Sequence, residues 1–134
     1  MAEYTIANLK SDVEDQAPNF GMSPDVEGRF ARQALELEQS GLSYQRIAPD
    51  FRVPFGHTHS KQEEIYVILS GGGRLKLGDE IVDVKQWDAV RVAPGTWRGF
   101  EAGPEGAELL AYGARSGMSP DDSDADMKQN WWSD

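Results

Sequence analysis

Two histidines and a glutamate near the middle of the chain have the spacing of a metal-binding group. His57 and His59 are two residues apart, so on an extended strand both imidazoles leave the same face. Glu64 follows at the head of an apolar run that ends in glycines. Two imidazoles and a carboxylate from neighbouring strands form an N,N,O donor set suited to Zn, Mn, Fe, Ni or Cu. The sequence has no other histidine, so these residues are the first candidates for chemistry.

The residues around this group have the alternating pattern of short β-strands. No long helical pattern interrupts them, so the pattern alone predicts an all-β sandwich or a closed barrel. We expect Gly78-Asp79 to close a two-residue hairpin, residues 71–73 to end a strand with a glycine turn, and residues 103–106 to form a loop. The strand-like segments cover residues 29–32, 35–38, 42–48, 65–69, 74–77, 80–84, 88–92, 96–100 and 108–112.

Length and composition indicate one soluble globular domain. The chain has 134 residues, enough for a single core, with 39% hydrophobic residues and a mean hydropathy of −0.58. No apolar run approaches the roughly 20 residues that a membrane-spanning helix needs, and the N-terminus lacks the basic and apolar regions of a signal peptide. Disulfides and a thiol nucleophile are excluded because there is no cysteine. We therefore expect a cytoplasmic protein without a membrane partner.

The net charge of −10 belongs to the two ends of the chain. Residues 29–118 hold twelve acidic and eleven basic side chains, whereas the remaining residues hold eleven acidic side chains against Lys10 and Lys128. The central domain is thus nearly neutral and offers no basic track to a phosphate backbone, so we expect no nucleic-acid partner. We interpret the acidic ends as solvated segments that keep the protein soluble.

The stretch from His57 to Gly71 resembles the first motif of the cupin superfamily, written G-x5-H-x-H-x(3,4)-E-x6-G. Every constrained position from His57 onward is present, and the x6 spacing to Gly71 favours Glu64 over Glu63 as the ligand. Only the leading glycine is missing, because Phe51 stands in its place. The resemblance covers roughly residues 42–112 and implies the family's double-stranded β-helix, an all-β jelly-roll barrel.

This fold divides the chain into three expected parts. Residues 1–28 would form an N-terminal arm packed on the barrel, residues 29–117 the cupin barrel, and residues 118–134 an acidic C-terminal tail. The tail ends in Trp131-Trp132, and two bulky indoles are expected to dock onto the body or a partner subunit rather than extend into solvent.

The second cupin motif, G-x5-P-x-G-x2-H-x3-N, is degenerate in this chain. Gly95 fits, but Trp87, Ala93 and Ala102 replace the first glycine, the proline and the asparagine. Arg98 stands where the family has its fourth metal ligand. Arginine is permanently cationic and does not ligate metals, so the resemblance supports the fold more strongly than a complete metal centre.

Three interpretations of this constellation remain open from the sequence. In the first, His57, His59 and Glu64 bind a divalent metal and Arg98 contacts an anionic ligand. In the second, no metal binds and Arg98 pairs with Glu64 in a polar barrel interior. In the third, the histidines are inert remnants of a site in a structural dimer.

Several neighbouring side chains are candidates for the wall of a ligand pocket. Tyr66 shares the face of Glu64, Phe100 that of Arg98, and Phe55 that of the two histidines, so we expect these three to line it. Tyr44 and Arg46 could either reach the same pocket or face solvent, and the pattern does not choose between them.

The resemblance implies a small-molecule-binding cupin of unspecified substrate; if it is an enzyme, the family implies a metal-dependent isomerase or dioxygenase type. The expected cofactor is a divalent transition metal, Zn, Mn, Fe or Ni, with no nucleotide cofactor. The expected partners are a small ligand, anionic if Arg98 contacts it, and a second copy of the chain in a homodimer. The alternative function is a metal-free sensing or binding module with an Arg98–Glu64 pair in its pocket.

Overall fold

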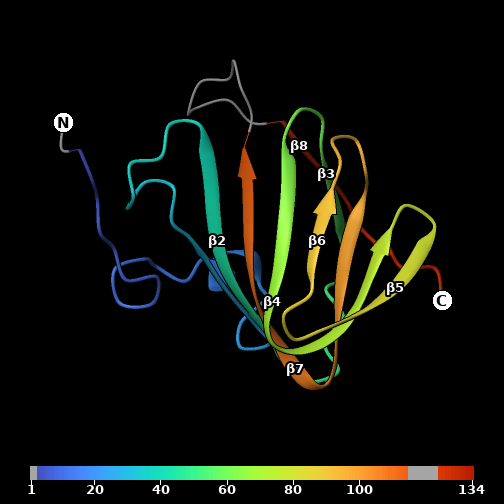
Figure 1. Cartoon of the computed structure of the whole chain (residues 1–134). Coiled ribbons are helices and arrows are strands. Elements are labelled where there is room, and N and C mark those ends of the chain that lie inside the picture. The colour runs from blue at the N-terminus through green and yellow to red at the C-terminus, as the bar shows by residue number, and fades with distance from the viewer. Residues whose placement is uncertain (1–2, 115–123) are drawn as a thin grey trace.

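A computed structural model describes residues 3–114 and 124–134 of the chain, and nearly all of its regular structure is antiparallel β-sheet (Figure 1). Among the described residues no helix is long and apolar enough to cross a membrane. The elements in chain order are η1 (Ala17–Phe20), β1 (Val26–Phe30), β2 (Ser40–Ile47), β3 (Gly56–His59), β4 (Glu63–Leu77), β5 (Glu80–Lys85), β6 (Ala89–Val92), β7 (Arg98–Ala114) and β8 (Ala125–Lys128).

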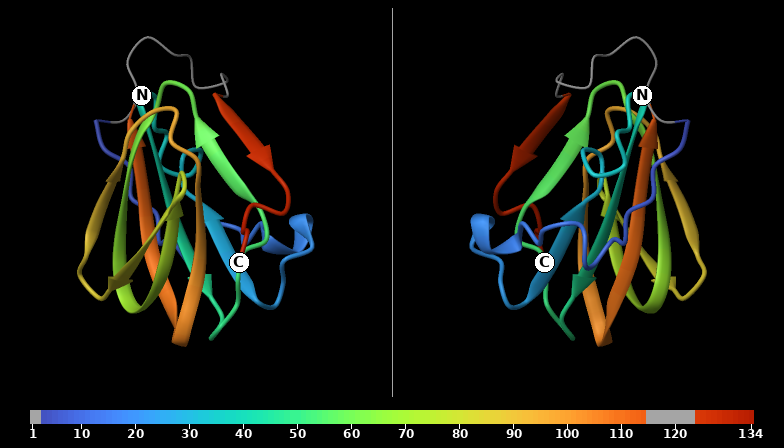
Figure 2. Two further views of the ribbon diagram at one scale, coloured as in Figure 1. Left: turned by 90° about the vertical axis from the view of Figure 1, so that its right-hand side faces the viewer. Right: turned by 90° about the vertical axis from the view of Figure 1, so that its left-hand side faces the viewer.

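The long strands β4 and β7 form the spine of the fold. They pair antiparallel from Glu63 opposite Ala114 to Leu77 opposite Arg98, and both curve along their length. On the other edge of β7, β2 pairs with its second half and β3 with its first residue, while β4 also pairs with β6 and β5. The sheet therefore curls around a central space, as Figure 2 shows from two sides. This confirms the prediction of an all-β jelly-roll barrel.

Two predicted chain breaks are wrong, because the long strands bend where we expected them to stop. Strand β4 continues through Gly71-Gly72-Gly73, and β7 continues through residues 103–106. The pairing of β4 with β7 shifts register at this point. A Cβ on Gly71, whose φ is +67°, would lie 2.0 Å from the carbonyl oxygen of Gly106. Glycine thus permits a close crossing of two bent strands here, which is a common use of glycine inside a sheet.

The segment 35–38 was also predicted as a strand and is instead a turn. The amide of Leu35 donates to the carbonyl of Ala31, and Glu36 has a φ of +57°, which lies outside the extended region. Four alternating residues are too few to separate a strand from a turn that happens to expose every second side chain. The hairpin at Gly78-Asp79 forms as predicted, with Leu77 opposite Glu80.

The core of the barrel is built from apolar side chains on five of its strands, and the most deeply buried of them lie on four. Ile47, Ile68, Leu75, Val92 and Leu109 are each at most 2% exposed and belong to one hydrophobic cluster. They come from β2, β4, β6 and β7, so their burial joins strands that are far apart in the sequence. This packing fixes the inner faces of β4 and β7, which carry the candidate site.

The C-terminal segment lies across the barrel rather than in solvent. Strand β8 pairs antiparallel with β3, placing Met127 opposite His57 and Ala125 opposite His59. The indole N–H of Trp132 donates to the carbonyl of Val53, and Trp131 covers Gly56 so closely that a Cβ there would lie 2.6 Å from the indole.

The three-part division of the chain stays a prediction. Strand β1 crosses its first boundary, because Val26–Phe30 runs past residue 28. The second boundary, between residues 117 and 118, lies outside the described residues.

Candidate metal centre

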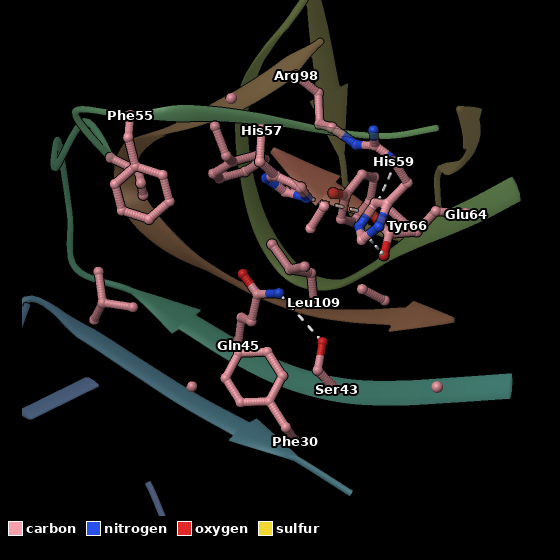
Figure 3. A pocket seen from close by; sticks show the side chains of 18 of the residues that line it. Phe30, Ser43, Gln45, Phe55, His57, His59, Glu64, Tyr66, Arg98 and Leu109 are labelled. Atoms are coloured by element: carbon pink, nitrogen blue, oxygen red, sulfur yellow. Dashed lines mark hydrogen bonds and ion pairs between the residues drawn. The ribbon is translucent and has the colours of Figure 1, made fainter. Parts of the chain in front are cut away.

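His57, His59 and Glu64 meet at the inner surface of the barrel, as their spacing predicted. Strand β3 carries both histidines on one face, and Glu64 reaches them from the start of β4 (Figure 3). One ligand atom from each residue lies within 4.8 Å of the other two. The Nε2 atoms of His57 and His59 each lie 3.8 Å from an oxygen of the Glu64 carboxylate. Glu63 points away, with a side chain that is 55% exposed, so Glu64 is the residue that belongs to the group.

The orientation of His59 is fixed by Asp124, which immediately precedes β8. The Oδ1 of Asp124 lies 2.9 Å from Nδ1 of His59, and Oδ2 accepts hydrogen bonds from the backbone amides of Lys61 and Gln62. Burial acts to raise the pKa of Asp124, but these bonds outweigh it and lower the pKa to about 2. An ionised Asp124 holds the proton of His59 on Nδ1, so Nε2 faces the site with its lone pair.

Glu64 is a buried carboxylate that stays ionised. Its side chain is 12% exposed, and burial acts to raise its pKa. Polar contacts with His57 and Tyr66 and the positive charge of Arg98 outweigh burial and lower the pKa to about 2. Near neutral pH this position therefore carries a negative charge, which is the form that binds a cation.

Arg98 lies beside this carboxylate and is only 1% exposed. It is the cross-strand partner of His57 and so projects from the same face of the sheet. Its Nη1 donates to the carbonyl of Thr96 at 2.8 Å and its Nη2 to Oε1 of Glu64 at 3.3 Å. Its Nε is buried and has no hydrogen-bond partner among the described residues. The structure therefore contains the Arg98–Glu64 pair that the second interpretation requires.

Tyr66 completes the polar end of the site. It lies two residues after Glu64 on β4 and is 7% exposed, with its hydroxyl against Glu64 and Arg98. Burial and the negative charge of Glu64 raise the pKa of the phenol above its ordinary value, so Tyr66 remains a neutral hydrogen-bonding group.

A cavity of about 460 Å³ opens directly onto this polar group. Its lining includes every residue that the sequence singled out for the site, namely Phe55, His57, His59, Glu64, Tyr66, Arg98 and Phe100. The structure thus brings the whole predicted set together around one space, although their roles in binding stay predictions.

The chain also matches a known family model. The model of the cupin domain matches residues 43–112, which is more than half of the chain. The chain belongs to the cupin family. No curated protein sequence matches it.

Solved structures with a similar fold share little sequence with the chain. A cupin protein from Bacteroides fragilis has a TM-score of 0.70 and 23% identity, covering 92% of this chain and 93% of that one. Streptomyces PAC13, a nucleoside dehydratase solved with uridine, has a TM-score of 0.69 and 14% identity over 97% and 92% of the two chains. Bacillus subtilis oxalate decarboxylase has a TM-score of 0.68 and 23% identity over 93% of this chain and 32% of that one. At these identities the likeness establishes the fold alone.

Three residues of this cupin site could not be found from the motif. Ser43 and Gln45 line the cavity from β2, whereas their neighbours Tyr44 and Arg46 face the other side and bond to Glu108 and Glu27. Strand alternation places Ser43 and Gln45 on one face of β2 and Tyr44 and Arg46 on the other, but it does not say which face points into the cavity. Asp124 carried no signal at all, because it resembles every other carboxylate of the acidic tail.

Proposed function

We propose that this cupin binds a small molecule at a divalent transition metal, Zn, Mn, Fe or Ni, held by His57, His59 and Glu64. The observation that carries the proposal is the convergence of three ligand atoms within 4.8 Å, with His59 already oriented by a carboxylate. Two imidazoles and one carboxylate on one side of a metal leave positions for water and a ligand on the other side.

The residues present fit such an ion. Each donor is of a type that these metals accept, and the carboxylate supplies the negative charge that offsets part of the charge of the cation. The contact between Asp124 and His59 is the arrangement that orients metal-binding imidazoles in proteins. When bound, the metal would supply either Lewis-acid polarisation of a ligand oxygen, which suits an isomerase, or activation of dioxygen, which a dioxygenase requires.

In this proposal Arg98 acts as the anion contact of the site. Its guanidinium is held in place by Thr96 and Glu64 and lines the same cavity as the histidines. A fixed cation in a water-poor space stabilises negative charge on a ligand oxygen without having to reorganise. This supports an anionic ligand.

A second candidate function is a metal-free binding or sensing module. The hydrogen bond from Arg98 to Glu64 favours it, because the guanidinium already occupies one carboxylate oxygen and neutralises its charge. A cation at this position also repels a divalent ion that approaches within a few ångströms. In this candidate the two histidines and Arg98 would bind the ligand directly.

Metal analysis of the full chain, purified without a histidine tag, separates the two candidates. The protein is incubated with Mn, Fe(II), Ni or Zn, passed through a desalting column and analysed for bound metal. The metal proposal predicts about one equivalent per chain for at least one of these ions. Less than about a tenth of an equivalent for all four would overturn the metal proposal.

The homodimer and the cytoplasmic location expected from the sequence stay predictions. Sedimentation velocity at tens of micromolar tests the first of them, and a monomer alone would contradict it.

A further inference from the structure

The cavity of this protein has two chemically different ends. One end holds the polar group of His57, His59, Glu64 and Arg98. The rest of the lining is largely apolar and aromatic, and the space of about 460 Å³ is in the range that proteins use for small organic ligands. A ligand that touched only the polar end would leave most of this cavity to water against apolar walls, which is unfavourable.

The apolar walls are formed by core residues whose inner sides face the cavity, together with residues nearer the opening. Phe55 lies on the side of the histidines, and Leu109 lies between the histidines and the Gln45–Ser43 pair (Figure 3). Phe100 also lines the cavity from β7. Toward the opening, Phe30 and Met127 also line the cavity and remain 54% and 56% exposed. Apolar contact therefore extends from the polar group to the mouth.

One further polar pair stands on the wall opposite the histidines. Gln45 projects from β2 into the cavity, and its Nε2 donates to the hydroxyl of Ser43 at 3.2 Å (Figure 3). A ligand with one hydrogen-bonding group on its body could exchange bonds with this pair. Among the described residues the lining holds no cluster of lysines or arginines for a phosphate, since it includes only two arginines, Arg32 and Arg98, and Arg98 is bonded to Glu64.

We infer that the ligand of this site is a small 2-oxo acid or related carboxylate with an apolar body, aromatic or branched. The inference rests on the proposed function and specifies its substrate class. The carboxylate and its neighbouring oxygen face His57, His59 and Arg98, and the body packs between Phe55, Phe100 and Leu109. A short diacid such as oxalate would satisfy the polar end alone.

Three commercially available probes test the inference with the unmodified full chain. Pyruvate carries the polar group alone, phenylpyruvate adds an aromatic body, and 2-oxoglutarate adds a charged one. Isothermal titration calorimetry is run with each probe, in the presence of Mn²⁺ and after treatment with a chelator. Phenylpyruvate is expected to bind roughly 10- to 100-fold more tightly than pyruvate, because its ring is removed from water. We expect 2-oxoglutarate to bind more weakly than phenylpyruvate.

A variant tests whether the higher affinity for phenylpyruvate than for pyruvate arises in this cavity. Ala111 lines the cavity from β7 and is 4% exposed, so A111L fills part of the space that the ring would occupy. The variant is expected to lose at least about tenfold in phenylpyruvate affinity and distinctly less in pyruvate affinity, although Ala111 is the cross-strand partner of Tyr66 at the polar end. The matched control is A114L, the same change on the same strand at an exposed position, which should leave both affinities unchanged.

The outcomes separate this inference from the proposed function. Equal affinities for pyruvate and phenylpyruvate, tighter binding of 2-oxoglutarate, or no binding of any probe overturns the ligand class, even if one equivalent of metal binds. If phenylpyruvate binds more tightly than pyruvate by the same factor with Mn²⁺ and with chelator, the ligand class is supported. If metal analysis also finds no bound ion, the metal is removed from the proposed function.

Discussion

The carboxylate of Asp124 lies 2.9 Å from Nδ1 of His59, a residue 65 positions earlier in the chain. The contact leaves Nε2 of His59 directed at Glu64, 3.8 Å away. Asp124 immediately precedes β8, so the C-terminal segment both orients the histidine and, through Ala125 and Met127, lines the cavity. The polar group of the site is therefore assembled from three parts of the sequence, namely residues 57–66, Arg98 and the C-terminal segment that begins with Asp124.

Replacing Asp124 by asparagine tests this orienting role. D124N keeps an oxygen acceptor for the amides of Lys61 and Gln62 but removes the charge that holds the proton of His59 on Nδ1. We expect metal affinity to fall roughly 10- to 100-fold, as for other carboxylates that orient metal-binding histidines. The control is D126N, which removes the same charge from an exposed position in β8. Equal affinities for both variants, measured by Mn²⁺ titration, would mean that Asp124 is not a positioning residue.

Replacing Arg98 by histidine tests what the cation does to the metal. The two residues 57 and 98 are cross-strand partners, so an imidazole at position 98 would start beside His57 on the same face. R98H removes the repulsion and offers a fourth ligand, so we expect metal affinity to rise by roughly tenfold or more. The metal-free variant should unfold at a lower temperature than the wild type, because Glu64 loses its buried partner. Unchanged metal affinity would show that the histidines do not bind the ion.

The low pKa of Glu64 makes stability depend on pH in a specific window. In the folded protein its pKa is about 2, lowered from the ordinary value of 4.5. A carboxylate whose pKa is lower in the folded state than in the unfolded state stabilises the fold fully at a pH above its unfolded-state pKa. This stabilisation is lost as the pH falls toward the folded-state pKa. The window therefore runs from about pH 4.5 down to about pH 2, and the contribution is on the order of 3 kcal/mol.

Urea unfolding of the metal-free protein measures this contribution. The difference in unfolding free energy between the wild type and E64Q should shrink as the pH is lowered from about 5 to about 2. E63Q is the matched control, because Glu63 is the neighbouring residue and has a side chain that is 55% exposed. A difference between the wild type and E64Q that does not change with pH would contradict the assigned pKa.

The contact between Trp131 and Gly56 couples the tail to the strand that carries the histidines. A Cβ at position 56 would lie 2.6 Å from Cγ of Trp131, so G56A should cost about 1–3 kcal/mol of stability by overpacking. In a W131A background the same change should cost much less, since the clashing ring is gone. G41A is the control, because a Cβ there meets nothing within 4 Å. Thermal unfolding of the four variants measures the coupling, and additive effects would argue against the contact.

The fold could be predicted from the sequence because the motif and the strand alternation agree. The hairpin at Gly78-Asp79 forms, and the strands of the motif have the expected order. The wrongly predicted chain breaks concern glycines, because glycine occurs both in turns that end strands and at bends inside strands. Residues 71–73 allow a strand to bend across another strand, yet in the sequence they look the same as a turn.

The site could be predicted only where its residues are close in sequence. His57, His59 and Glu64 fall within eight positions of one another; strand alternation places the two histidines on one face, and the motif spacing selects Glu64. Asp124 is far from them in sequence and is brought to His59 only by the fold, so no sequence spacing predicts its contact. The bond between Arg98 and Glu64 is one of the alternatives open from the sequence, and the register of β7 beside β3 and β4 brings the two side chains together.

The most direct test of the metal centre is a Mn²⁺ titration of the untagged full chain and of the double variant H57A/H59A, followed by electron paramagnetic resonance. Bound Mn²⁺ is distinguished from free Mn²⁺ by the loss of the sharp signal of the aqueous ion. We expect about one bound ion per wild-type chain and none in the double variant, whose circular dichroism should match the wild type. Equal binding by both proteins would contradict a metal centre at His57, His59 and Glu64, and binding by neither would exclude Mn²⁺ as its metal.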